Sequence, residues 1–168
     1  MPVEDVRPDG RSPNSPIRNP GLHSRASSPR DAKQNATDVA YYVDTSALAK
    51  LVVAEPETDA LEAWFAQIER NPVSSDLART ELLRTVRRVA PELVVRARDV
   101  LDSVTLIQIT TAMFEHAALL DPTMLRSLDA LHLSAALGLG DDLEGLVTYD
   151  DRLAHAATAN GIRVTAPT

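Results

Sequence analysis

Four carboxylates that lie far apart in the sequence could act on a phosphodiester if the fold brings them together. Two of them directly follow short β-prone runs and two lie in apolar helical stretches: Asp44, Asp150, Glu81 and Asp129. Clustered carboxylates bind hard divalent cations such as Mg²⁺ and Mn²⁺, which prefer oxygen ligands. A cation held in this way neutralises the phosphate, orients a water molecule and lowers the pKa of that water. The pattern therefore indicates metal-assisted hydrolysis of a phosphodiester, with one metal ion or two.

Each of these acids also has a structural explanation. An aspartate that begins a helix can cap it or complement the helix dipole, and this applies to Asp44, Asp129 and Asp150. Glu81 can form an ion pair with Arg84, three residues later, worth about 0.2–0.5 kcal/mol. The functional interpretation therefore rests on the four acids as a group and not on any one of them.

Hydroxyl, histidine and arginine side chains near the acids could support such a site or serve the fold alone. Thr45, Ser46 and Thr148 could orient the carboxylates, or bond locally in helix caps and turns. His132 follows Asp129 by three residues, and we expect it to be packed or on the surface rather than in the site. The basic residues of one predicted helix could bind nucleic-acid phosphates or form a solvated helix face: Arg79, Arg84, Arg87 and Arg88.

Short strands that alternate with helices must position these residues. Strands are predicted at 40–43, 72–75, 105–109, 146–148 and 162–164, and helices at about 46–53, 56–70, 77–86, 91–101, 111–120, 129–138 and 151–159. Such alternation is typical of a parallel sheet with helices on both faces. The predicted fold class is therefore α/β, with a central parallel sheet of about four to five short strands. In such sheets, sites form at the carboxyl ends of the strands, where Asp44 and Asp150 lie. Trp64, in the second helix, is expected in the core.

The first 38 residues differ from the rest in composition. They hold six of the eleven prolines and many serines, and they have no helical or strand periodicity. A segment with so little apolar surface cannot offset the entropy of ordering. We therefore expect a disordered N-terminal extension at 1–38 and one folded domain at 39–168.

The overall composition excludes several classes of protein. The chain has no cysteine, which excludes disulfides, thiolate-bound zinc, iron–sulfur clusters and a cysteine nucleophile. Its net charge of −7 is unusual for a nucleic-acid-binding protein, but a carboxylate site is itself negative until cations bind. No apolar stretch approaches the roughly 20 residues of a membrane span, and the N-terminus does not have the pattern of a secretory signal. We expect a cytoplasmic protein without membrane attachment.

Four short segments, each with one of the acids, occur in a recognisable order. They are Val43–Leu51, with a Thr-Ser pair after the acid; Ala78–Leu82; the alanine-rich Leu128–Ala136; and Val147–Leu153. In order and spacing they resemble the motifs of PIN-domain ribonucleases, the VapC toxins of type II toxin–antitoxin systems. The similarity extends over about residues 40–168 and leaves out the N-terminal extension.

This resemblance implies a function and a role for each acid. It implies a toxin that is a Mg²⁺-dependent endoribonuclease, with Mn²⁺ as a possible substitute. Asp44 and Asp129 would be the principal metal ligands, and Glu81 and Asp150 would complete the acidic pocket. Asp151 matches the fourth motif less well than Asp150, and we favour a capping role for it. The implied partners are RNA, a VapB-type antitoxin that covers the groove with a basic side chain among the acids, and a second copy of the toxin in a homodimer.

Three other functions are considered. A phosphatase of the haloacid dehalogenase type needs a second acid two residues after the first, where this chain has Ser46. A phospho-receiver domain needs paired acids and a later lysine after a strand, and neither is visible. A PIN-like scaffold that binds RNA or a partner without cleaving it is the alternative that remains, and the presence of all four acids argues against it.

Overall fold

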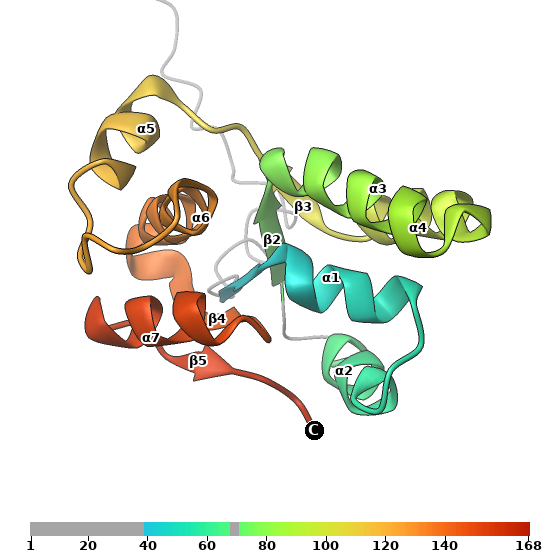
Figure 1. Cartoon of the computed structure of the whole chain (residues 1–168). Helices are drawn as coiled ribbons and strands as arrows, with labels where there is room; N and C mark the ends of the chain where they lie inside the picture. Colours follow the sequence, from blue (N-terminus) through green and yellow to red (C-terminus); the bar gives the residue numbers. More distant parts are fainter. Residues whose placement is uncertain (1–38, 68–70) are drawn as a thin grey trace, which may run out of the picture. The chain divides into compact units, whose positions relative to one another are not determined.

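A single parallel sheet organises the domain. The computed structural model describes residues 39–67 and 71–168, and within them the strands have the order β3-β2-β1-β4-β5 (Figure 1). The strands are β1 (Ala40–Val43), β2 (Asn71–Ser75), β3 (Thr105–Ile107), β4 (Leu143–Val147) and β5 (Val164–Thr165). The predicted α/β class and the sheet of about four to five parallel strands are confirmed. The predicted disordered extension at 1–38 lies outside the described residues, so the domain boundary at residue 39 stays a prediction.

Helices follow the strands and cover both faces of the sheet (Figure 1). In the described part of the chain they are α1 (Thr45–Val52), α2 (Thr58–Phe65), α3 (Leu77–Val89), α4 (Val94–Asp102), α5 (Thr111–Ala117), α6 (Ser127–Leu137) and α7 (Asp151–Ala159), with short 3₁₀ turns η2 (Pro91–Leu93) and η3 (Gly140–Asp142). None of the described helices has the length and apolar character needed to cross a membrane.

The central strand β1 contributes to a hydrophobic core on each side of the sheet. Successive side chains of a strand point to opposite faces. Val43 accordingly packs in the core formed with α1, α3 and α4, while Tyr42 packs in the core formed with α6 and α7. The neighbouring strand β4 repeats this division, with Val147 in the first core and Leu146 in the second. All four side chains are fully buried, so β1 and β4 are fixed from both faces.

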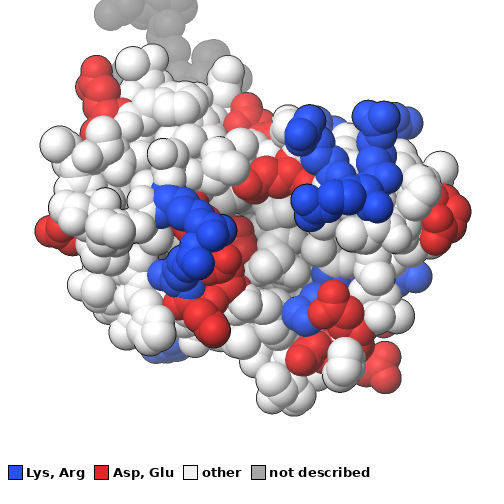
Figure 2. Space-filling model, viewed as in Figure 1, with Lys and Arg blue, Asp and Glu red and all other residues white. Residues whose placement is uncertain are grey.

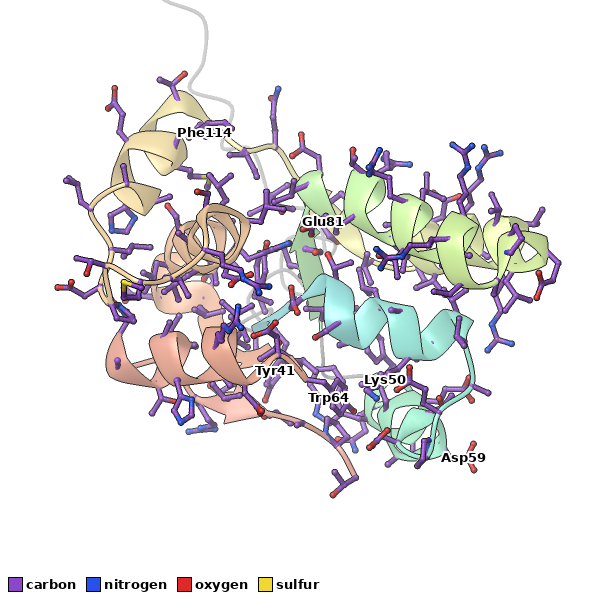
Figure 3. The ribbon with its side chains drawn as sticks, viewed as in Figure 1. Tyr41, Lys50, Asp59, Trp64, Glu81 and Phe114 are labelled. Atoms are coloured by element: carbon purple, nitrogen blue, oxygen red, sulfur yellow. The ribbon has the colours of Figure 1, made fainter. Side chains whose placement is uncertain are left out.

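Trp64 lies in the first of these cores, as predicted. Its ring packs edge-on against Tyr41 of β1, with ring centroids 5.0 Å apart, and against Phe65, at 5.3 Å (Figure 3). Edge-to-face pairs at these separations are favourable arrangements of aromatic rings. The indole therefore attaches α2 to the sheet.

Two strands begin two or more residues away from their predicted starts. Strand β4 begins at Leu143 rather than 146, because Gly145 hides the strand pattern. A Cβ at Gly145 would lie 2.9 Å from the carbonyl oxygen of Arg163, so the close approach of these two backbone segments requires glycine there. The last strand begins at Val164 rather than 162, because the amide of Ile162 donates to Ala157 at the end of α7 and is not available to the sheet.

The strand order creates one place where loops diverge from the sheet. The chain runs outward from β1 through β2 to β3, and then returns to the other side of β1 as β4. The loops after β1 and β4 therefore lead to opposite faces, and the space outside their carboxyl ends, here called the crevice, is where sheets of this kind bind ligands. Asp44 follows β1, and its amide donates to Val147 at the end of β4 (2.9 Å). This hydrogen bond joins the ends of β1 and β4 at the base of the crevice.

Candidate active site

Asp44 is fixed at the end of β1 by a network of hydroxyl groups. It caps α1, and its Oδ2 accepts from the amide and the hydroxyl of Ser46 (3.1 and 2.6 Å) and from the hydroxyl of Thr148 (3.0 Å). The two hydroxyls are in turn fixed by amides after β4, from Tyr149 to Ser46 (2.9 Å) and from Asp150 to Thr148 (3.0 Å). Asp44 is only 6% exposed. Oδ2 thus accepts all three of these hydrogen bonds. The other oxygen, Oδ1, lies 3.7 Å from Nε2 of His132 on the side of the crevice.

Glu81 enters the crevice from α3 and is held by two side chains (Figure 3). Its Oε2 accepts from the hydroxyl of Thr45 (2.7 Å) and from Nε2 of His132 (2.7 Å). Burial by itself would raise the pKa of Glu81, but the hydrogen bond and charge of His132, together with the Thr45 hydroxyl, outweigh it and lower that pKa. Glu81 therefore ionises more readily than an ordinary glutamate. The ion pair with Arg84, considered above as the structural explanation of Glu81, is not present among the described residues, because these two partners take its place.

His132 is the site residue that the sequence prediction assigned to packing or the surface. It is only 2% exposed, yet its imidazole reaches the acids. Nε2 lies 2.7 Å from Glu81 Oε2 and 3.7 Å from Asp44 Oδ1, and Nδ1 lies 2.8 Å from the hydroxyl of Tyr42 on β1. The spacing of three residues from Asp129, which places both on one helix face, was the signal that could have identified it.

The protonation of His132 follows from its neighbours. Burial lowers the pKa of the imidazole, but the hydrogen bond to Glu81 and the charges of Asp44, Glu81 and Asp129 outweigh burial and raise it. Because a carboxylate only accepts hydrogen bonds, Nε2 carries a proton in either charge state of the ring. His132 thus joins the two acids of the β1 and α3 side.

Asp129 lies in the first turn of α6 and has a carboxylate oxygen that is buried without a hydrogen bond. Within the described residues Oδ2 has no partner. Burial raises the pKa of Asp129, and the charges of Asp150 and Asp44 raise it further, against the opposing charges of Arg126 and His132. An unbonded, buried oxygen among like charges is costly for the fold. A hard divalent cation would remove this cost, so the donor set fits such an ion.

Asp150 lies three residues after the end of β4 and caps α7. Its Oδ1 accepts from the amides of Arg152 (2.8 Å) and Leu153 (3.1 Å), and its charge acts on Asp129. The capping role that we favoured for Asp151 is wrong, because Asp150 provides the cap and Asp151 is an exposed residue of the first turn. Asp150 therefore both caps α7 and belongs to the candidate site.

All four predicted acids therefore border the same crevice. His132 bridges Glu81 and Asp44, and Asp129 is coupled to Asp44 and Asp150 by charge. Figure 2 shows acidic side chains in the middle of this face with basic side chains on either side. As these side chains stand, no three Asp, Glu or His residues in the described part of the chain have the arrangement of a complete metal site. Their chemistry suits a cation that would draw the carboxylates together.

Comparison with known proteins gives a consistent result. The model of the PIN domain family matches residues 41–159. Ribonuclease VapC46 of Mycobacterium tuberculosis is 42% identical over 129 residues, which are 76% of this chain and 98% of that protein, and ribonuclease VapC47 of the same species is 38% identical over 130 residues, which are 75% and 96%. A toxin–antitoxin complex from Klebsiella pneumoniae contains a chain of similar structure, with a TM-score of 0.56, 26% identity and coverage of 76% of this chain and 98% of that one.

Proposed function

The chain belongs to the PIN-domain family, as one of its VapC-type ribonuclease toxins. We propose that it is an endoribonuclease, which hydrolyses internal phosphodiester bonds of RNA. The reaction would take place at the crevice formed by Asp44, Glu81, Asp129 and Asp150. The observation that carries this assignment of the site is the buried, unbonded Oδ2 of Asp129 beside two further carboxylates. A carboxylate oxygen in this state is suited to bind Mg²⁺ or Mn²⁺. Asp129 and Oδ1 of Asp44 would be the principal ligands.

The residues of the crevice would have different roles in the reaction. A cation held by these residues would neutralise charge on the phosphate and lower the pKa of a water molecule. Glu81, with its lowered pKa and its two hydrogen bonds, would hold negative charge in a fixed place and would be a poor proton acceptor. Asp150 uses Oδ1 for the cap of α7, so its other oxygen would accept the proton of the attacking water.

The proposed activity predicts a strict dependence on a divalent cation. The purified chain should cleave single-stranded RNA with Mg²⁺ or Mn²⁺, and EDTA should stop the reaction until the cation is restored, because the carboxylates repel a phosphate when no cation is present. Expression without an antitoxin should stop growth. Cleavage that continues in EDTA would contradict the metal site. RNA binding without cleavage under all conditions would favour the non-catalytic scaffold.

Asp150 and Asp151 provide a matched pair of variants. Asp150→Asn should lower cleavage about 10²-fold, the lower end of what a general base contributes, because an amide cannot accept the proton of the attacking water. Since Asn is also a good helix cap, α7 should stay folded. Asp151→Asn should leave cleavage unchanged, because Asp151 is exposed and lies outside the network. Cleavage rates of the two variants, with circular dichroism as the control for folding, decide the ranking, and a reversed order would assign the fourth position to Asp151.

We further propose a VapB-type antitoxin and a second toxin subunit as partners in the cytoplasm. The Klebsiella relative was solved as a toxin–antitoxin complex, which supports an antitoxin here. The unneutralised acids of the crevice would attract a basic antitoxin side chain. Large apolar side chains of α5 and the loop after it are exposed, as surfaces that bury against a partner are: Phe114, Leu119 and Met124.

A further inference from the structure

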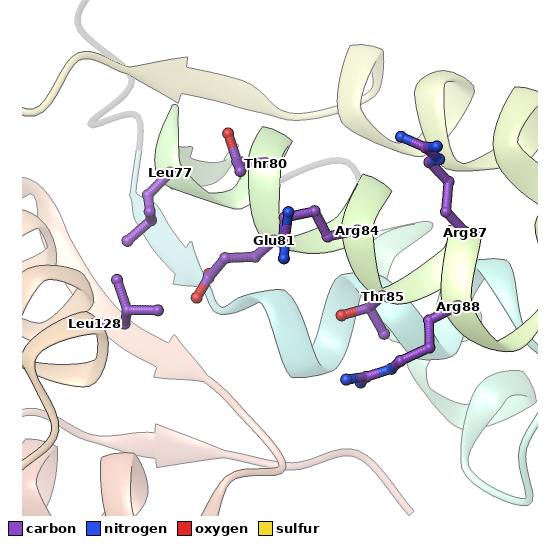
Figure 4. A pocket seen from close by; sticks show the side chains of 8 residues that line it. All are labelled: Leu77, Thr80, Glu81, Arg84, Thr85, Arg87, Arg88 and Leu128. Carbon is purple, nitrogen blue, oxygen red and sulfur yellow. The ribbon is translucent and has the colours of Figure 1, made fainter.

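A pocket opens beside the crevice, and apart from Glu81 its lining residues have no role in the proposed chemistry. It has a volume of about 670 Å³, within the range of pockets that hold small molecules. Seven of its lining residues belong to α3 and one to the start of α6: Leu77, Thr80, Glu81, Arg84, Thr85, Arg87, Arg88 and Leu128 (Figure 4). Glu81 is part of both places, so an occupant of this α3 pocket would lie next to the acids.

The α3 pocket has two chemically different ends. Leu77 and Leu128 face each other at one end, where α3 and α6 begin (Figure 4). Arg84, Arg87 and Arg88 lie at the other end, and Glu81 lies between the two (Figure 4). Leu128 is 47% exposed, so its side chain is accessible to a ligand. The arrangement suits a ligand with one apolar, flat part and one anionic part.

The arginines of the α3 pocket are available for an anion. Among the described residues none of the three takes part in an ion pair, although Glu81 lies within one turn of Arg84. The carboxylate of Glu81 is held instead by Thr45 and His132. A guanidinium without an acidic partner is well suited to bind the two oxygens of a phosphate.

We propose that the α3 pocket is a nucleotide subsite that binds single-stranded RNA next to the bond that is cut, an inference that rests on the proposed function. Arg84 and Arg88 bind backbone phosphates, and an unpaired base lies against Leu77 and Leu128. At a rise of 1.5 Å per residue, Arg84 lies about 4.5 Å and Arg88 about 10.5 Å along α3 from Glu81. The strand therefore runs along α3 away from the acids. A base in a duplex is paired and stacked and cannot reach the leucines, so the subsite selects unpaired RNA.

The test measures RNA binding in EDTA, where no cleavage is expected. An unstructured RNA oligonucleotide is titrated into wild type, Arg84→Ala, Arg88→Ala and the matched control Arg98→Ala, an exposed arginine of α4 outside the pocket. Each pocket variant should lose about tenfold in affinity at low salt, and the slope of log K against log salt should fall by about 0.7 for each lost phosphate contact. Arg98→Ala should behave as the wild type does.

The apolar end is tested with Leu128→Ala. This variant should bind the oligonucleotide more weakly and should bind an abasic oligonucleotide of equal length as well as the wild type does. Unchanged affinity and salt slope in both arginine variants would overturn the proposal, and so would equal affinity of the wild type for the duplex form. Variants that keep RNA binding and lose binding of the antitoxin would assign the pocket to a protein segment instead. A wild type that cleaves RNA while these binding tests fail would retain the proposed function and reject the subsite alone.

Discussion

Replacing Asp129 with Asn is expected to lower the rate of RNA cleavage by about 10³-fold and to raise the melting temperature of the metal-free protein. The first effect follows from the loss of a proposed metal ligand. The second follows from the raised pKa of Asp129, since burial and the charges of Asp150 and Asp44 disfavour its ionised form in the folded state. Above that pKa the ionised carboxylate lowers the free energy of unfolding, and a neutral amide of the same shape does not.

Cleavage assays and thermal unfolding, each with and without Mg²⁺, separate the two effects. Mg²⁺ should raise the melting temperature of the wild type, because it binds the folded state, and should have a smaller effect on Asp129→Asn. Asp141→Asn, at an exposed acid of η3, is the control for a lost negative charge. A cleaving Asp129→Asn protein, or one whose metal-free form melts below the wild type, would contradict the role given to this carboxylate.

His132→Leu is expected to destabilise the protein by about 2–4 kcal/mol and to lower cleavage about 10- to 100-fold. Leucine cannot bond the Tyr42 hydroxyl, which is buried on the inner side, or the Glu81 carboxylate on the crevice side. Each of these polar groups would lose a partner, and Glu81 would lose its fixed orientation. His132→Gln should recover part of the activity, because a glutamine amide can still donate to Glu81.

Chemical denaturation and cleavage kinetics on His132→Leu and His132→Gln distinguish a positioning role from a purely structural one. His155→Leu, at an exposed histidine of α7, controls for the substitution itself. If His132 serves packing alone, activity at full folding should be equal in the two His132 variants. A difference in rate between them, with both fully folded, would support the positioning of Glu81.

The fold was predictable because its signals are local. Val43 before Asp44, and Val147 before Asp150, end β-prone runs that precede helices, and this pattern alone predicts parallel strands with acids at their carboxyl ends. The start of β4 was not predictable, because glycine is required at position 145 by the carbonyl of Arg163, which lies in the neighbouring segment before β5. A contact between segments far apart in the sequence leaves no mark in the local pattern.

The acids of the candidate site could be predicted from the sequence, and the hydrogen bonds that His132 and Glu81 form could not. Helix α6 is apolar around most of its circumference, with Ala130, Leu133 and Ala136 buried alongside His132. The apolar pattern of α6 therefore could not indicate which way His132 points, and only its spacing of three residues from Asp129 could. The missing Glu81–Arg84 pair has a similar cause, since its competitors Thr45 and His132 approach only in the folded chain. The assignment of the four acids to catalysis stays a prediction.

The hydroxyl network around Asp44 joins residues that are far apart in the sequence, so the proposed active site needs both of these segments. Asp44 stands at the start of the domain, while Thr148, which holds it, and Asp150 stand near the C-terminus. The segment from Asp44 to Asp150 must therefore have been synthesised before the crevice can form. Products that end before Thr148 would lack part of this network, so translation has to pass this residue before the proposed activity can appear.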